Sequence, residues 1–183
     1  MFILLVGPKG SGKSYIGRTL EKHLGVLFFH VEPLWMSYYA ECQASGRQPL
    51  ISDGIAKVHP LLADALQTHE HVCIETIGAS AEILNDWLSL THPSNTLVVR
   101  VSAPLELCLE RIVTRDQTNQ IAMDVESVRQ AYALSEAVQL QPDLTLENVQ
   151  LTEAEIISLF KSALTRPSSG QPRQAGSAAD VER

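Results

Sequence analysis

Short apolar runs alternate with amphipathic stretches along the first 165 residues of the chain. The runs are too short for helices, are rich in β-branched and aromatic residues, and are apolar at consecutive positions. This composition is typical of strands that are buried on both faces of a parallel sheet. The pattern predicts strands at residues 2–6, 26–30, 71–77, 96–101 and 143–147.

The stretches between these runs repeat their apolar residues with helical periodicity. Ile16, Leu20 and Leu24 stand four residues apart, so they share one face of a helix. The same reasoning predicts helices at residues 13–24, 54–69, 79–90, 104–114, 124–139 and 152–164. Three of them begin with capping signals, two serines and one capping-box pattern: Ser80, Ser102, and Thr152 with Glu155. Strands alternating with helices predict an α/β fold, an open parallel sheet with helices on both faces.

The end of the chain differs in composition from the rest. From Arg166 onward the sequence is rich in Pro, Gly, Ser, Gln and Ala, and Val181 is its only large aliphatic residue. Such a segment buries too little apolar surface to offset the entropy lost on ordering, so we expect residues 166–183 to form a disordered tail. Residues 1–165 are then a single domain, as the length of 183 residues also indicates.

Charge and cysteine content narrow the classes of function. Fourteen basic and 21 acidic residues give a net charge of −7, which disfavours nucleic-acid binding through general attraction to phosphates. No apolar run approaches the roughly 20 residues of a membrane span, and the N-terminus has no secretory signal pattern. Three widely spaced cysteines (Cys42, Cys73 and Cys108) form no metal motif and are expected to be reduced. We therefore expect a cytoplasmic protein that binds neither membrane nor nucleic acid.

Residues 7–14, Gly-Pro-Lys-Gly-Ser-Gly-Lys-Ser, match the pattern G-x-x-x-x-G-K-S/T. They lie directly between the first predicted strand and the first predicted helix, where backbone N–H groups can bind phosphate. Lys13 is expected to reach the β- and γ-phosphates, and the Ser14 hydroxyl is expected to bind Mg²⁺. The alternative, a glycine-rich turn before a helix, would match all the fixed positions only rarely by chance. The motif predicts a nucleoside triphosphate site formed by Gly7, Pro8, Lys9, Gly10, Ser11, Gly12, Lys13, Ser14 and Tyr15.

With this motif in place, the chain resembles the P-loop kinases of small molecules, the group that contains shikimate, gluconate and adenylate kinases. The resemblance covers about residues 1–164. It implies a three-layer fold around a five-stranded parallel sheet in the order 2-3-1-4-5. It also implies ATP and Mg²⁺ as cofactors, and transfer of phosphate to a small acceptor.

Two arginines, Arg111 and Arg115, stand four residues apart near the end of a predicted helix and share one face. We interpret the polar segment that follows, residues 115–123, as a short lid. A similar pair precedes the lid of adenylate and shikimate kinases. By this resemblance Arg111 would stack on the adenine and Arg115 would reach the transferring phosphate. The residues alone leave open a solvated helix face with acidic partners.

Two carboxylates are expected at the carboxyl edge of the sheet, where ligands bind in such folds. Glu75 lies near the end of the third predicted strand, and burying it is costly unless Mg²⁺, Lys13 or an acceptor hydroxyl pairs with it. Glu32 follows the second strand at the place of one of two acids in shikimate kinases, whereas His30 replaces the other. Glutamate followed by threonine, as at Glu75, also resembles the zeta-toxin branch, whose acceptor is a nucleotide sugar. The alternative for either glutamate is an ordinary carboxylate without a chemical role.

Residues 33–59 are expected to form an acceptor-binding cap. Its aromatic residues Trp35, Tyr38 and Tyr39 either stack on a ring of the acceptor or pack a helix. Four residues are candidates for binding an anionic acceptor: Arg47, Lys57, His59 and Arg129. The triple glycine and the substrate-binding arginine of shikimate kinases are missing, as is the Gly-Phe-Pro-Arg signature of adenylate kinases, so shikimate itself is not expected.

The sequence thus predicts an ATP- and Mg²⁺-dependent phosphotransferase that acts on a small hydroxylated acceptor. Its catalytic residues would be Lys13, Arg115, Glu32 and Glu75. The alternative is a nucleotide-binding module, such as a slow NTPase or a switch, that has no acceptor. The histidine at position 30 favours this alternative.

Overall fold

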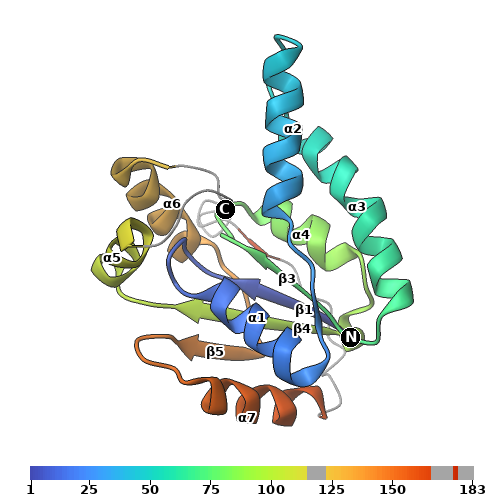
Figure 1. The fold of residues 1–183 in the computed structure, drawn as a ribbon, viewed down its shortest axis with the longest axis vertical. Coiled ribbons are helices and arrows are strands. Elements are labelled where there is room, and N and C mark those ends of the chain that lie inside the picture. The colour runs from blue at the N-terminus through green and yellow to red at the C-terminus, as the bar shows by residue number, and fades with distance from the viewer. Residues whose placement is uncertain (115–122, 166–174, 177–183) are drawn as a thin grey trace.

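The computed structural model describes residues 1–114, 123–165 and 175–176. Within this part of the chain, a five-stranded parallel sheet in the order β2-β3-β1-β4-β5 lies between two layers of helices (Figure 1). The strands are β1 (Phe2–Val6), β2 (Leu27–Phe28), β3 (Val72–Thr76), β4 (Thr96–Ser102) and β5 (Leu144–Glu147). The predicted fold class and strand order are confirmed.

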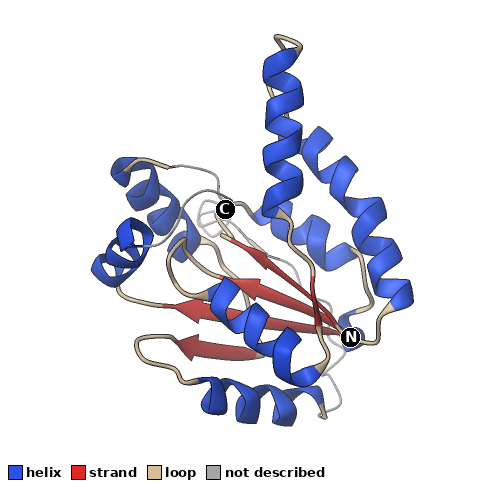
Figure 2. Cartoon of the chain, in the orientation of Figure 1, coloured by secondary structure: helices blue, strands red, loops and turns tan. Residues whose placement is uncertain are grey.

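Helices cover both faces of the sheet (Figure 2). Helices α1 (Lys13–Leu24) and α7 (Glu153–Leu164) pack on one face, and α3 (Ile51–Thr68) and α4 (Ala81–Ser89) pack on the other. Helix α2 (Glu32–Ala44) projects away from the sheet, and α5 (Leu105–Thr114) and α6 (Val125–Ala137) lie toward the carboxyl ends of the strands. A short 3-10 helix, Pro93–Asn95, precedes β4.

The central strand β1 shows why its consecutive positions are all apolar. Phe2, Leu4 and Val6 pack in a cluster with residues of α3 and α4, whereas Ile3 and Leu5 pack in a second cluster with residues of α1 and α7. Successive side chains of a strand point to opposite faces, so a strand covered by helices on both sides must be apolar throughout.

The edge of the sheet departs from the prediction. Strand β2 spans only residues 27–28 instead of 26–30, because the chain turns away from β3 toward α2, whose first turn contains Pro33. The Phe29 N–H still donates to the Cys73 carbonyl (2.8 Å). Helix α3 begins at Ile51, earlier than the predicted residue 54.

Two of the three predicted helix caps are present. The Ser80 hydroxyl accepts from the Ile83 N–H at the start of α4, and Thr152 forms the expected capping box at the start of α7. The third prediction was wrong, because Ser102 is the last residue of β4, where it pairs with β5, and α5 begins only at Leu105.

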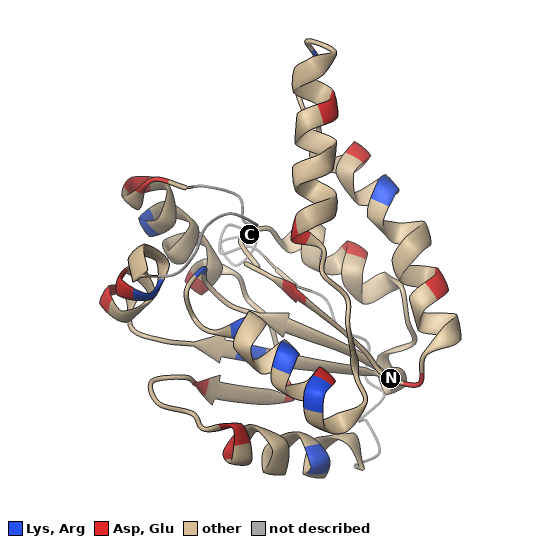
Figure 3. Ribbon diagram, in the orientation of Figure 1, with Lys and Arg blue, Asp and Glu red and all other residues tan. Residues whose placement is uncertain are grey.

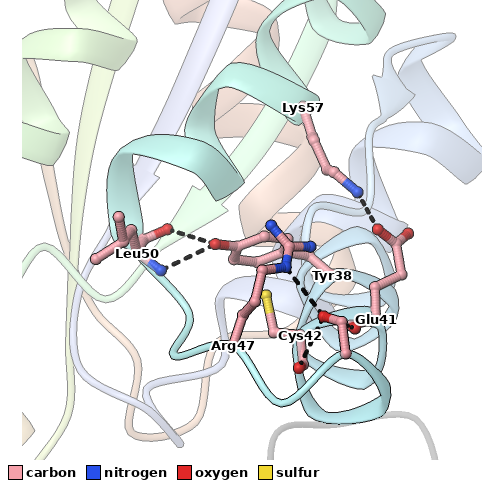
Figure 4. Close-up of polar contacts among 7 residues, drawn as sticks. Tyr38, Glu41, Cys42, Arg47, Leu50 and Lys57 are labelled. Atoms are coloured by element: carbon pink, nitrogen blue, oxygen red, sulfur yellow. Dashed lines mark hydrogen bonds and ion pairs between the residues drawn. The ribbon is translucent and has the colours of Figure 1, made fainter.

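The segment predicted as a cap is a pair of helices, α2 and the first half of α3 (Figure 1). The Tyr38 hydroxyl donates to the Leu50 carbonyl (3.0 Å) and accepts from the Leu50 N–H (2.9 Å), which joins the two helices (Figure 4). A Cβ atom at Gly54 would lie 2.0 Å from Cζ3 of Trp35, so glycine allows the indole ring to lie directly against α3.

The predicted lid, apart from Met123, and most of the predicted tail lie outside the described residues. Of the tail, Ala175 and Gly176 are described. Gly176 forms an antiparallel bridge with Gln139, and the backbone of Ala175 makes two hydrogen bonds with the Asn85 side chain. Among the described residues, no helix is both long and apolar enough to span a bilayer.

Candidate active site

The loop between β1 and α1 adopts backbone angles that favour glycine. Gly10 has a φ of 85° and Gly12 has a φ of 95°. A Cβ atom at Gly10 would lie 2.4 Å from the Cys108 carbonyl oxygen, and one at Gly12 would lie 2.0 Å from Nδ2 of Asn148. Both positions therefore require glycine, because the left-handed conformation and the close approach of α5 and of the loop after β5 leave no room for a side chain.

The same loop presents the N-terminus of α1. Gly12 is the N-cap residue, and no side-chain oxygen accepts a hydrogen bond there. The loop is bound to the sheet through the Gly7 N–H, which donates to the Thr76 carbonyl of β3 (3.2 Å). A helix N-terminus with a partial positive charge and uncapped N–H groups is suited to bind phosphate oxygens.

Lys13 lies inside the loop. Its ammonium group donates to the carbonyl oxygens of Gly7 (2.7 Å) and Pro8 (2.9 Å), and only 6% of the residue is exposed. The flexible stem of a lysine can transfer its ammonium donors to other oxygens nearby. The ammonium group of Lys13 thus lies beside the loop backbone, and its predicted contact with the phosphates stays a prediction.

Ser14 and Glu75 meet where α1 begins and β3 ends. The Ser14 hydroxyl lies 2.8 Å from Oε1 and 3.0 Å from Oε2 of the Glu75 carboxylate. Within the described ranges no cluster of three or more His, Cys, Asp or Glu could hold a metal. Mg²⁺ does not need such a cluster, because one or two protein oxygens suffice when substrate phosphates and waters complete the shell. The hydroxyl and carboxylate oxygens of this pair therefore fit Mg²⁺ bound to a nucleotide.

Glu32 lies in the first turn of α2 and contacts the loop. Its Oε1 atom is 3.6 Å from Nζ of Lys9, and the Glu32 side chain is 31% exposed. This ion pair connects the phosphate-binding loop to the cap. Both acidic residues predicted for the site thus lie beside the loop, one on the sheet and one on the cap.

Arg111 and Asn148 support the outer side of the loop. The Arg111 guanidinium donates to the carbonyls of Val149 (3.0 Å) and Gly10 (3.4 Å). The buried Asn148 side chain donates from Nδ2 to the Ser11 carbonyl (2.8 Å). The sequence reasoning did not select Asn148, although a polar residue directly after the last strand was an available signal.

Cys108 packs behind Gly10 without a chemical role of its own. Burial raises the pKa of its thiol, and the nearby positive charges of Lys13 and Arg111 oppose this shift only in part. The thiol is protonated at neutral pH and is therefore a poor nucleophile. Cys42, Cys73 and Cys108 are all buried and form no disulfides.

A cavity of about 530 Å³ extends from the loop toward α2 and α4. Its loop end is lined by Lys9, Gly10, Gly12, Lys13, Ser14 and Glu75. Its other end is lined by residues of α2, of the start of α3, of the loop after β3 and of α4, together with Met123. Glu32, in the first turn of α2, also lines the cavity.

Other predicted site residues lie outside this cavity. Tyr15 is 42% exposed on α1, and His30 is exposed with its ring 4.3 Å from that of Phe28. Neither lines the cavity. Arg115 lies outside the described residues. Of the cap aromatics, Trp35 and Tyr39 line the cavity, whereas Tyr38 is buried.

The four candidates for binding an anionic acceptor do not line the cavity either. Lys57 pairs with Glu41 on the outer side of the cap, and Arg47 donates to the Ser45 hydroxyl at the tip of α2 (Figure 4).

The remaining two candidates are also engaged elsewhere. The guanidinium of Arg129 lies 3.6 Å from the Glu106 carboxylate. The His59 ring packs 5.4 Å from that of Trp87, and its Nε2 atom is buried without a hydrogen-bond partner.

The sheet order and the glycine-rich loop define the P-loop kinase fold. A sequence model described as AAA domain matches residues 2–137, and the chain belongs to this family. A search of curated proteins gave no match.

Three solved structures illustrate the shared fold. A gluconokinase from Sinorhizobium meliloti 1021 is 18% identical with a TM-score of 0.61, over 90% of this chain and 91% of that chain. A sugar kinase from a Janibacter species is 15% identical with a TM-score of 0.64, over 89% and 93% of the two chains. A shikimate kinase from Acinetobacter baumannii, in complex with shikimate, is 21% identical with a TM-score of 0.53, over 90% and 95%. The resemblance to P-loop kinases of small molecules is confirmed.

Proposed function

We propose that the protein is an ATP- and Mg²⁺-dependent phosphotransferase that phosphorylates a hydroxyl group of a small acceptor. The observation that carries this proposal is one cavity that is lined by Lys13 and the Ser14–Glu75 pair and also, at its other end (the second compartment), by residues of α2, α3 and α4. A nucleotide-binding module without an acceptor would need the loop but not the second compartment. The related folds of a gluconokinase and a shikimate kinase support the same reading.

The loop end of the cavity would bind the nucleotide. Backbone N–H groups of the loop and the N-terminus of α1 would hold the phosphates, and the Lys13 ammonium would exchange its two carbonyl acceptors for phosphate oxygens. Arg111, beside the Val149 carbonyl, remains the candidate for stacking on the adenine. Arg115 remains our expectation for neutralising the transferred group.

Ser14 and Glu75 would hold Mg²⁺, which when bound neutralises charge on the phosphates. This role leaves Glu32 as the better candidate for the acceptor-side carboxylate, because both oxygens of Glu75 already face the Ser14 hydroxyl. Glu32 instead lies at the start of α2, next to the second compartment.

In the transfer step, the acceptor oxygen forms a bond to the γ-phosphorus while the bond from that phosphorus to the bridging oxygen breaks. ADP leaves with the electron pair of the broken bond. The hydroxyl proton passes to the Glu32 carboxylate and from there to water. The contribution of the protein is mainly positioning and charge neutralisation.

The test is a screen for ADP release with ATP, Mg²⁺ and a library of hydroxylated metabolites, followed by mass spectrometry of the product. We expect at least one acceptor to give one phosphorylated molecule for each ADP. Lys13→Ala should lower turnover by roughly 1,000-fold, since it removes a charge that stabilises the transferring group. Lys22→Ala, an exposed change on the same helix, should leave turnover unchanged. Tight ATP binding without a phosphorylated product would instead identify a nucleotide-binding module.

A further inference from the structure

The second compartment of the cavity has an aromatic and apolar wall. Helix α2 contributes Trp35 and Tyr39, α3 contributes Ile51, and α4 contributes Ile83 and Trp87. The rings of Trp35 and Tyr39 lie one helical turn apart, with centroids separated by 5.9 Å and planes inclined by 37°. They form one continuous ring surface on the cavity side of α2, and Tyr39 is 37% exposed and therefore accessible.

This surface is held in position before any ligand binds. The indole of Trp35 lies against the backbone of α3 at Gly54, where a Cβ atom would be only 2.0 Å away. The hydrogen bonds between Tyr38 and Leu50 fix α2 against α3 just beside it (Figure 4). A preformed surface binds a ring at a lower entropic cost than one that must be assembled.

The charged side chains of the described lining are Lys9, Lys13, Glu32 and Glu75, which all surround the phosphate-binding loop. The helix α4, on the far side of the compartment, carries no Lys or Arg, in contrast to α1 (Figure 3). Lys57, the basic residue of α3, is held by Glu41 and by the ring of Tyr38, 5.5 Å from its ammonium. Beyond the loop, the described lining of the cavity therefore includes no Lys or Arg.

The charges of the cavity lining and its aromatic rings both influence which class of acceptor the cavity can bind. The described cations that line the cavity, Lys9 and Lys13, belong to the loop, where Lys9 pairs with Glu32 and Lys13 is expected to bind the nucleotide. An anionic acceptor would therefore lose hydration near two carboxylates without a described cation dedicated to it, which is costly. An uncharged acceptor avoids this cost. A planar ring additionally gains from offset or edge contacts with the two aromatic side chains.

We infer that the acceptor is an uncharged compound whose hydroxyl group is carried on, or next to, a planar ring. This inference rests on the proposed function, because it identifies the acceptor class of the same site. The ring packs on Trp35 and Tyr39, and the hydroxyl group faces Glu32. The cavity of about 530 Å³ is within the size range that encloses small organic ligands.

The inference is tested with a panel of defined acceptors under the same ADP-release assay. Thymidine, uridine and phenylethanediol represent uncharged ring compounds, glucose and sorbitol represent uncharged compounds without a planar ring, and gluconate and shikimate represent anions. We expect kcat/KM for the best ring compound to exceed that of either anion by about 10-fold or more, from stacking and from the absence of a buried unpaired charge.

Substitutions of Tyr39 give the sharper comparison. Tyr39→Phe keeps the ring and should leave kcat/KM for ring compounds within about twofold, whereas Tyr39→Arg should lower it about fivefold, because stacking is lost. Tyr39→Arg also supplies a cation, so it should raise kcat/KM for gluconate or shikimate. Leu61→Arg adds the same charge at an exposed position of α3 outside the cavity and should change neither value. All variants keep the wild-type KM for ATP if the effect is confined to the acceptor.

Three results would overturn the inference. A preference of the wild-type protein for gluconate, shikimate, glucose or sorbitol would refute it while leaving the proposed function intact. If Tyr39→Arg changes kcat/KM equally for ring compounds and for anions, the surface formed by Trp35 and Tyr39 does not select the acceptor. Absence of any phosphorylated product would refute the inference and the proposed function together.

Discussion

The two ends of the cavity are built in different ways. At the nucleotide end, the surface is mainly backbone: a loop with two left-handed glycines, the N-terminus of α1 and one lysine folded over carbonyl oxygens. At the proposed acceptor end, the lining includes side chains from separate helices, above all Trp35 and Tyr39 of α2 and Trp87 of α4.

This difference has a physical consequence. A backbone surface depends on the loop conformation, so replacing one constrained glycine affects every phosphate contact together. A side-chain surface can be changed one residue at a time while the fold persists. Nucleotide binding is therefore expected to be fixed by the architecture, and acceptor choice is expected to be set by a few exchangeable side chains.

The largest effect is expected for Gly12→Ala. The substitution forces a Cβ atom to within 2.0 Å of the Asn148 amide at a φ of 95°, so the loop must change its path. We expect ATP affinity to fall about 100-fold, which combines backbone strain with overpacking. The measurement is calorimetric titration with ATP and Mg²⁺.

Gly46→Ala is the matched control in the cap. Gly46 also has a left-handed φ, of 64°, but an added Cβ would meet no atom within 4 Å. Gly46→Ala should lower the free energy of unfolding without changing the affinity for ATP. Equal losses of ATP affinity in both variants would mean that backbone strain in general, rather than the loop itself, governs nucleotide binding.

Asn148→Ala should have the next largest effect. Loss of the Nδ2 donor leaves the Ser11 carbonyl without this partner in a buried place, a change worth about 1–3 kcal/mol. If part of this free-energy cost falls on the ATP-bound protein, the Kd for ATP rises about 10-fold. The KM for the acceptor should stay constant, and an unchanged Kd for ATP would remove Asn148 from the site.

Gly54→Ala addresses the acceptor end. Its Cβ atom would displace the Trp35 ring from the surface of α3. We expect the KM for the acceptor to rise about fivefold, because the ring surface is no longer preformed, while the KM for ATP is unchanged. Steady-state kinetics, with each substrate varied in turn, measures the two KM values separately. A rise confined to the KM for ATP would contradict the assignment of the two ends.

The smallest functional effect is expected for Thr152→Ala. This substitution removes the capping box of α7, which lies away from the cavity. The free energy of unfolding should fall by about 1 kcal/mol, as for other N-cap substitutions. Both KM values should stay at wild-type levels, whereas Ser158→Ala on the exposed side of the same helix should change neither stability nor kinetics appreciably. Altered kinetics in Thr152→Ala would show that stability loss alone mimics a site effect.

The contrast between the two ends also explains what the sequence could predict. The strands and the loop were predictable because the evidence for them is local: apolar runs such as residues 2–6, and the pattern of glycines before Lys13 and Ser14. The order of the strands came from the resemblance that the loop motif carries. Glu32 and Glu75, which both line the cavity, were predictable because each lies just after, or at the end of, a strand whose carboxyl end is where ligands bind in such sheets.

The other features of the site could not be predicted, because they depend on packing between segments that are far apart in the sequence. Tyr38 is buried whereas Trp35 and Tyr39 line the cavity. This difference depends on how α2 is oriented against α3, and the hydrogen bonds between Tyr38 and Leu50 hold that orientation. The support of the loop by Asn148 requires that the end of β5 lie close to Ser11. Similarly, the ion pair that holds Lys57 outside the cavity is apparent only once α3 is placed beside Glu41.

The most direct test of the account is a crystal structure of the protein with Mg²⁺ and a non-hydrolysable ATP analogue at saturating concentration. The account predicts the triphosphate on the N–H groups of residues 10–14, with Nζ of Lys13 moved from the Gly7 and Pro8 carbonyls to phosphate oxygens. It also predicts Mg²⁺ beside Ser14 and Glu75. Nucleotide bound elsewhere, with Lys13 still on its two carbonyls, would contradict the account.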